Sequence, residues 1–340
     1  MDFRVSDDQT ALAEGIRSVV TGRLPLERLR AGEGAESAIS AADWAVLGQT
    51  GVFSLTRAEP EGAGLGMADA VVVYEELGRA LVPGPLIGTY LAAAAGLVEG
   101  AAEGAVQVGL HSGGSGPILI EHLASLAALL VLPGFDKRAT PRLLVPAPDA
   151  AAGTRLAAPL CPLTPMWHLP SLPAGDPVAD VGTTLVRDGS LLAAALQVGH
   201  AAEALDLAVA YAKERQQFGQ PIGTFQAVKH ICADMLVRAE VARSAVHAAA
   251  CLADEPDVVS AEAEVTGCAG DALVARATMG AKLLADEAAI ANGRAAIQVY
   301  GGMGFTWEVP LHLHLKRSRL LATTLGSPSH LAAALSGLAS

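Results

Sequence analysis

The sequence is poor in aromatic residues, in cysteine and in clustered positive charge. Only 4% of its 340 residues are aromatic while 51% are hydrophobic, so the core must be built mainly from Ala, Leu and Val, which favours closely packed helices. The four cysteines show no C-x-x-C spacing, which argues against a disulfide framework or a zinc site and indicates a reducing compartment. A net charge of −12 without a long basic run argues against nucleic acid or an anionic membrane surface as a partner.

Signals for export or membrane insertion are also lacking. The chain opens on Met1-Asp-Phe-Arg-Val, without the basic start and apolar block of a signal peptide. Its most apolar windows, 90–97 and 123–132, are well short of the roughly 20 residues that span a bilayer. We therefore expect a soluble cytoplasmic protein that contacts neither membrane nor nucleic acid.

The first hundred residues contain clear helix-start signals. Ser6 precedes two acidic residues and Ser40 precedes an Ala-rich run, and both are typical N-caps, here for helices over 7–21 and 41–47. A Gly-rich turn follows at about 57–66, which we interpret as a chain reversal because it matches no phosphate-loop pattern. Further helices are predicted over 67–81 and 87–98.

The pattern of residue types changes between residues 105 and 187. Short apolar runs at 105–110, 117–120, 128–132, 143–145 and 184–186 alternate with Gly, Pro and Ser, and prolines crowd the later part. This pattern indicates a small β region with long loops. We therefore predict three domains, covering residues 1–104, 105–187 and 188–340.

The last domain is again helical. Long apolar helices are predicted over 191–213, 225–252 and 261–293, and rods of that length are typical of a four-helix bundle. The predicted fold class is therefore mainly α with a small β middle domain.

A polar break separates the first two of these long helices. Gly and Pro residues between 219 and 223 stop a continuous helix, and Thr224 can cap the next one. Arg215 offers a fork of donors to a phosphate, and Phe218 offers a face to a planar ring. The alternative, a solvated arginine and an aromatic core residue, remains open at this point.

A second break follows the third long helix. Gln298 leads into a Gly-Gly-x-Gly sequence at 301–304, whose bare backbone amides allow the close approach of a ligand. The alternative interpretation is an ordinary helix-ending glycine motif.

These segments together resemble the acyl-CoA dehydrogenase family. One family segment is similar to Leu65-Gly66 followed by E-E-L-G-R at 75–79. A second is similar to R-x-x-F-G at 215–219 with Ile222 and Phe225-Gln226. A third is similar to Q-x-x-G-G-x-G at 298–304. The resemblance covers about residues 1–100 and 190–330. It implies a helical N-terminal domain, a reduced β domain and a C-terminal four-helix bundle.

The resemblance also implies FAD as cofactor. In that family FAD lies between subunits, and the second and third segments bind the pyrophosphate and adenosine end of the flavin seated in the neighbouring subunit. The arginine would pair with a phosphate, the phenylalanine would pack on the cofactor, the glutamines would donate hydrogen bonds and the glycines would let the backbone approach. The implied cofactor-binding residues are Arg215, Phe218, Gln226, Gln298, Gly301, Gly302 and Gly304.

The family's catalytic base has no counterpart in this sequence. The reaction removes an α-proton from an acyl-CoA thioester while hydride leaves the β-carbon for the flavin, so a carboxylate is required. The two positions at which the family places this glutamate fall at Leu325 and Gly189, which cannot accept a proton. We also find neither the T-E-P-x-A-G-S-D-like segment nor the W-I-[ST] strand that hold the flavin ring, so no catalytic residue is predicted.

The pattern is similar to the shortened chain of actinobacterial α2β2 acyl-CoA dehydrogenases of steroid side-chain breakdown. It implies a homologous full-length partner whose own site takes the acyl-CoA. One alternative is a self-sufficient homomeric dehydrogenase whose base is Asp188, Glu203 or Glu308. A second alternative is a flavin-free structural subunit.

A metal enzyme is not indicated. His312 and His314 are two residues apart on a predicted helix and would point to different sides, and His200 and His230 suit core or surface positions.

Overall fold

The computed structural model describes residues 4–113, 116–133, 140–178, 182–255, 259 and 270–337. The N-terminal helices are α1 (Asp7–Arg23), α2 (Leu26–Arg30), α3 (Ala41–Gln49), α4 (Met67–Arg79) and α5 (Leu86–Ala94). The strands of the middle region are β1 (Gln107–Ser112), β2 (Ile118–Glu121), β3 (Leu126–Leu132), β4 (Arg142–Leu144), β5 (Thr154–Arg155), β6 (Met166–Leu169) and β7 (Asp176–Pro177). The C-terminal elements are α6 (Gly182–Glu214), β8 (Gln216–Gln217), β9 (Gln220–Pro221), α7 (Gln226–Asp254), α9 (Gly270–Tyr300), α10 (Leu311–Leu321) and α11 (Pro328–Gly337). Short 3₁₀ turns are η1 (Leu123–Ser125), η2 (Ala150–Ala152), η3 (Ile222–Thr224) and η4 (Gly301–Phe305).

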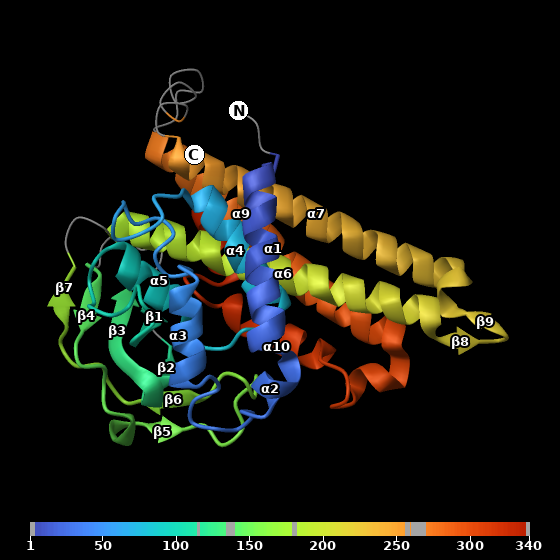
Figure 1. Ribbon diagram of the computed structural model, residues 1–340, viewed down its shortest axis with the longest axis horizontal. Coiled ribbons are helices and arrows are strands. Elements are labelled where there is room, and N and C mark those ends of the chain that lie inside the picture. The colour runs from blue at the N-terminus through green and yellow to red at the C-terminus, as the bar shows by residue number, and fades with distance from the viewer. Residues whose placement is uncertain are drawn as a thin grey trace.

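Helix α6 is the central element of the molecule. It packs against α4 and α5 of the N-terminal part and against α7, α9 and α10 of the C-terminal part. Figure 1 shows α6 crossing the middle of the molecule, with the sheets at one end and the β8–β9 hairpin at the other. The expected order of helical, β and helical regions is confirmed.

The predicted helix starts agree with the structure. Ser6 caps α1 in a capping box with Gln9, and Ser40 accepts a hydrogen bond from the Asp43 N–H at the start of α3. The start of α4 is capped from a distance, because the amides of Met67 and Ala68 donate to the Asp254 carboxylate over 2.7 and 2.8 Å. That contact ties the N-terminal helices to the end of α7.

The E-E-L-G-R segment is a structural junction. Helices α4 and α6 cross so closely that a Cβ at Gly78 would lie 2.3 Å from the Leu196 carbonyl oxygen. Around this crossing, Glu75 pairs with Arg243 of α7 at 2.8 Å and Arg79 pairs with Asp206 of α6 at 2.7 Å. The segment therefore fixes three helices to one another and lies apart from the predicted cofactor residues.

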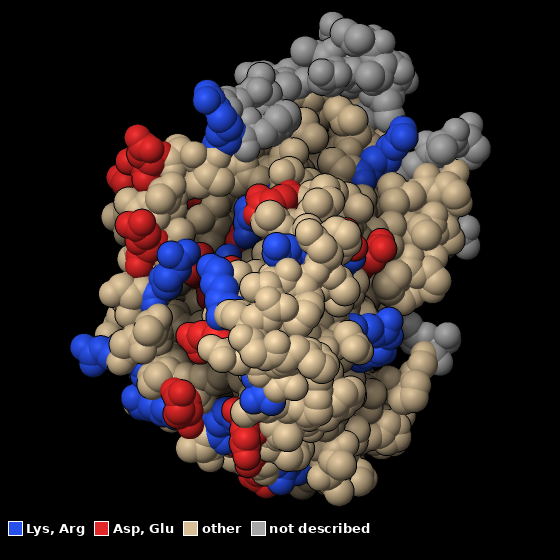
Figure 2. All heavy atoms as spheres, turned by 90° about the vertical axis from the view of Figure 1, so that its right-hand side faces the viewer, with Lys and Arg blue, Asp and Glu red and all other residues tan. Residues whose placement is uncertain are grey.

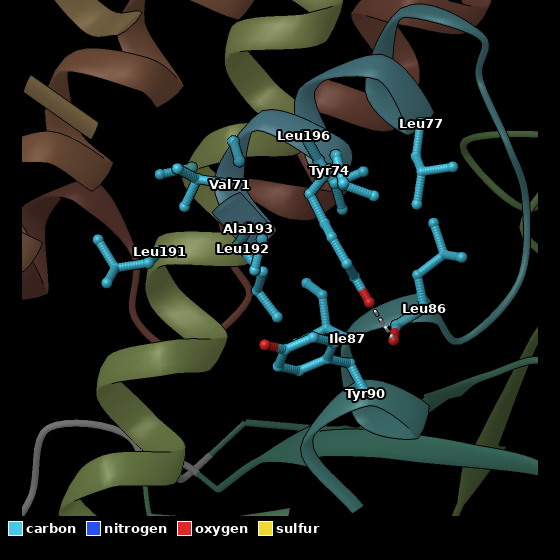
Figure 3. Close-up of a cluster of buried hydrophobic side chains, with 14 of the residues drawn as sticks. Val71, Tyr74, Leu77, Leu86, Ile87, Tyr90, Leu191, Leu192, Ala193 and Leu196 are labelled. Atoms are coloured by element: carbon cyan, nitrogen blue, oxygen red, sulfur yellow. Dashed lines mark hydrogen bonds between the residues drawn. The ribbon is translucent and has the colours of Figure 1, made fainter. Parts of the chain in front are cut away.

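Aromatic side chains reinforce the core where these helices meet α5. Tyr74 donates a hydrogen bond to the Leu86 carbonyl over 3.1 Å, and its ring meets Tyr90 edge-on with centroids 5.5 Å apart (Figure 3). Leu191 and Leu196 of α6 lie on the other side of the same cluster, so the N-terminal helices and the bundle share one core.

The middle region consists of two small sheets. One has the order β1-β3-β4-β7, with β1 and β3 parallel, and the other has the order β2-β6-β5. The prediction of a strand at 184–186 is wrong, because these residues belong to α6. A run of three residues is too short to show either a helical or a strand periodicity. Only its burial in the helical core shows that it forms a helix. The proposed boundary at 187/188 consequently falls inside α6.

Two local predictions for the bundle also require correction. Thr224 does not cap α7, because its hydroxyl donates to the Pro221 carbonyl and closes η3, while Phe225 holds the cap position. The third long helix does not end at Gly293, which lies inside α9 and packs on Leu315. Glycine there provides close contact between helices. Residues 261–269 of the predicted helix lie outside the described residues.

Candidate functional site

The first predicted cofactor segment forms a small hairpin. Strands β8 and β9 pair antiparallel around Phe218 and Gly219, whose φ angles of 54° and 78° are those of a tight two-residue turn. The Arg215 amide donates to the Tyr211 carbonyl, and the Ile222 amide donates to the Arg215 carbonyl, both over 2.8 Å. The hairpin presents Phe218 to solvent with 92% of its surface exposed. The alternative of a core phenylalanine is therefore wrong.

The second segment follows directly on α9. Gly301 has a φ of 62° and, like Gly302, has open space where a side chain would stand. Gly304 is buried, and a Cβ there would lie 2.7 Å from the Ile297 carbonyl oxygen. Gly304 thus lets the chain fold back on α9, while the first two glycines present bare backbone at the surface.

Two tyrosines bring the segments together. Tyr211, four residues before Arg215, stacks on Tyr300 with ring centroids 3.9 Å apart and an interplanar angle of 12°. The Tyr300 hydroxyl also donates to the Leu207 carbonyl over 3.2 Å. The two segments consequently occupy the same end of the bundle, which faces the viewer in Figure 2. Neither tyrosine was among the predicted site residues.

The polar side chains of the site have no internal partner. Arg215, Gln226 and Gln298 are exposed, and within the described part of the chain their side chains make no hydrogen bond or ion pair. Next to the glycines, Phe305 is 80% and Trp307 56% exposed. In a chain with only 4% aromatic residues, two of them are thus exposed beside the glycine segment. These groups could bind an anion and a planar ring together.

The two family base positions lie against each other. A Cβ at Gly189 would be 2.6 Å from Leu325 Cδ1 and 3.1 Å from Leu91 Cδ1. Leu325 is fully buried, and its backbone N–H donates to the Ser112 hydroxyl over 3.2 Å. The place is filled with aliphatic carbon, and neither position offers a group that can take a proton.

The three alternative bases lie in different surroundings. Asp188 pairs with Arg187 at 2.6 Å, and burial raises the pKa of its carboxyl. Burial also raises the pKa of Glu203, which lies 3.5 Å from Arg79. Both residues are on α6, where 15 residues correspond to about 22 Å, so they belong to different places. Glu308 is exposed beside Trp307.

The histidines do not converge on one point. His200 and His314 are buried with their Nδ1 atoms 3.1 Å apart, whereas His312 packs edge-on against Trp307 with centroids 4.5 Å apart. His230 is exposed. Across the described ranges, no three His, Cys, Asp or Glu side chains are grouped closely enough to hold a metal ion.

Among the residues that the structure describes, one helix is long and apolar enough to cross a membrane. This helix, Thr184–Glu214, is the central α6, and 78% of its most apolar window is buried inside the molecule, as in a core helix.

Comparison with known proteins identifies the family of this chain. Residues 183–331 match the acyl-CoA dehydrogenase C-terminal domain. Acyl-CoA dehydrogenase IpdE2 of Mycolicibacterium smegmatis is 33% identical over 95% of this chain and 96% of its own length. The chain therefore belongs to the acyl-CoA dehydrogenase family.

Solved structures agree with this assignment. A variant of the Tcur3481-Tcur3483 steroid ACAD superposes with a TM-score of 0.79 at 26% identity, covering 99% of this chain and 98% of that one. The ChsE4-ChsE5 complex from Mycobacterium tuberculosis shares the fold, with a TM-score of 0.79 at 22% identity over 99% of this chain and 98% of that one.

Proposed function

We propose that this chain is the non-catalytic subunit of a heteromeric, FAD-dependent acyl-CoA dehydrogenase. Its partner is a homologous full-length chain that holds the flavin, and the two form an α2β2 assembly. This chain contacts the adenosine and pyrophosphate end of that flavin through Arg215, Phe218, Gln226, Gln298 and the 301–304 glycines. The acyl-CoA, of a steroid-related kind, binds in the partner's site. We place the enzyme in the cytoplasm.

The observation that carries this proposal is the contact between Gly189 and Leu325. The two positions that hold the family's alternative bases are 136 residues apart in sequence, yet a side chain at one would touch the other. That convergence supports the correspondence with the family, because either glutamate would then reach the same substrate atom. Because neither position carries a carboxylate, we propose that a group on the partner chain removes the proton.

The exposed end of the bundle supports the remaining half of the proposal. FAD supplies the hydride acceptor when it is bound. This chain's residues would hold its non-reacting end. Arg215 would form charge-assisted hydrogen bonds to a phosphate, Gln298 would bind through its side-chain amide, and the exposed Gly301 and Gly302 would let the backbone approach. The names of the two similar solved structures each join two proteins, which agrees with a heteromer. One of them is described as a steroid ACAD, which agrees with a steroid-related substrate.

Co-expression with candidate full-length homologues tests the proposal. We expect a complex with one flavin for each pair of unlike chains, and no flavin on this chain alone. Arg215→Ala should reduce the flavin content of the complex at least about tenfold at limiting FAD, because it removes one charged hydrogen-bond partner of the phosphate. Lys213→Ala, an exposed cation two residues away, should leave flavin content unchanged.

Each rival predicts a different result. A yellow homo-oligomer that turns over an acyl-CoA without a partner would support the self-sufficient enzyme. A complex whose flavin content is insensitive to Arg215→Ala would leave only a structural role for this chain.

A further inference from the structure

The two segments proposed to hold the flavin are carried by different helices. Strand β9 packs against α6, whereas η4 packs against α9 and α10. Gln197 of α6 donates to Asp286 of α9 over 2.8 Å. Further along both helices, Asn292 donates to the Ala201 carbonyl over 3.1 Å, so α6 and α9 run parallel and end on the same side of the molecule. The contact between their last turns therefore decides how far apart the two segments lie.

Tyr211 and Tyr300 form that contact. Their stacked rings are joined by two polar contacts that cross between the helices. The Tyr300 hydroxyl of α9 donates to the Leu207 carbonyl of α6, and the Tyr211 hydroxyl of α6 donates to the Met303 sulfur of η4 over 4.0 Å. Both rings are half-buried against the apolar end of the bundle. Each tyrosine thus binds to the side that carries the other segment.

Short paths lead from the two rings to the groups proposed to contact the flavin. The Arg215 amide donates to the Tyr211 carbonyl over 2.8 Å, which fixes the first residue of the hairpin to the turn that carries one ring. Gly301 follows Tyr300 directly in the chain. A ligand that is held at two points needs those points fixed to within about 0.5 Å, and packing of the supporting side chains provides this precision.

We propose that Tyr211 and Tyr300 are positioning residues, whose stacked rings set the spacing between Arg215 and Gly301 so that both segments bind one flavin. This inference rests on the proposed function. The pair acts through the segments that it joins. Loss of the stacking should therefore weaken flavin binding although every group that contacts the flavin is still present.

The Kd of FAD for the assembled complex tests this role. Tyr300→Leu removes one stacked ring and should raise the Kd about 3–10-fold, because an aromatic pair of this kind contributes that much to an equilibrium. Tyr300→Phe keeps the ring and should bind FAD like the parent. Gly78→Ala is the control for general destabilisation, because its added methyl group meets the Leu196 carbonyl away from the flavin segments, and it should leave the Kd unchanged.

Two further measurements separate positioning from a purely structural role. Because Tyr300 acts partly through Arg215, Tyr300→Leu should raise the Kd less in an Arg215→Ala background than in the parent. In the isolated chain, Tyr300→Leu should also speed hydrogen exchange of the Arg215 and Ile222 amides, whose bonds close the base of the hairpin.

Several results would overturn the inference. They are an unchanged Kd or unchanged amide exchange in Tyr300→Leu, an equal loss of affinity in Tyr300→Phe or Gly78→Ala, and additive effects of Tyr300→Leu and Arg215→Ala. In each of these cases Arg215→Ala can still lower the flavin content, and the proposed function stands. A flavin content that does not respond to Arg215→Ala would overturn both.

Discussion

At the scale of single residues, the contact between Gly189 and Leu325 is the most informative feature for the proposed function. Leu325 fills the place that a Gly189 side chain would enter, and Leu91 and Ile87 complete an aliphatic pocket around it. A glutamate at either position would be surrounded by carbon, which disfavours its charged form. Asp188 precedes this point by one residue and is held by Arg187.

Asp188→Asn separates the proposed subunit from a self-sufficient enzyme. We expect kcat/KM of the complex to stay within about twofold of the parent, because a base would be worth roughly 10²–10⁴-fold. A loss in that larger range would identify Asp188 as the base.

The same variant should alter stability in a pH-dependent way. Burial raises the folded-state pKa of Asp188, so the ionised carboxylate destabilises the fold above that pKa, while below the unfolded value of about 3.9 the carboxyl is protonated in both states. The Tm difference, Asp188→Asn minus parent, should therefore increase from about pH 4 to neutral pH. A difference that falls with pH would contradict the assigned shift.

At the scale of elements, helix crossings explain motif residues that look functional in the sequence. Gly78 and Gly199 bring α4 and α6 into backbone contact, since a Cβ at Gly199 would lie 2.1 Å from the Glu75 carbonyl oxygen. The charged residues of the same segment pair across helices that the crossing brings together. Close approach, not ligand binding, accounts for this segment.

Gly78→Ala tests that account. The added methyl group would meet the Leu196 carbonyl at 2.3 Å, and we expect the free energy of unfolding to fall by about 1–3 kcal/mol despite alanine's better helix propensity. Gly280→Ala is the matched control, because no atom lies within 4 Å of its Cβ position in α9. That variant should gain about 0.5–1 kcal/mol. Equal effects in denaturant titrations would exclude steric contact as the cause.

At the scale of the whole molecule, α6 separates two ends with different surfaces. One end holds the sheets and the aliphatic contact between Gly189 and Leu325. The other presents Phe218, Phe305 and Trp307 to solvent beside the glycine segment, an arrangement typical of a surface that a partner covers.

Phe305→Asp should therefore weaken association with the partner. Phe305 is 80% exposed, so the change leaves the fold intact, while burial of its ring in a complex would contribute about 1.5–3 kcal/mol. We expect the Kd to rise roughly 10–100-fold. Val145→Asp, at a 61% exposed position beyond β4, is the control and should leave Kd unchanged. An unaffected Kd for Phe305→Asp would remove this end from the interface.

Local signals in the sequence predicted most of the elements and the two breaks that follow α6 and α9. Ser6 and Ser40 stand at real helix starts, because a side chain that caps nearby amides acts over three residues. The errors at 184–186 and Gly293 have a shared origin, because distant packing decides both, as where Leu315 packs on Gly293. The error at Thr224 is local, because its hydroxyl donates to the Pro221 carbonyl instead of capping α7.

The sequence by itself determined the class of fold and the positions of the polar breaks, because these depend on residue type and spacing along the chain. Only the tertiary structure decided that Gly189 touches Leu325, that Tyr211 stacks on Tyr300, and that the E-E-L-G-R segment serves packing. Such contacts join residues far apart in the chain, and their geometry follows from how whole helices pack.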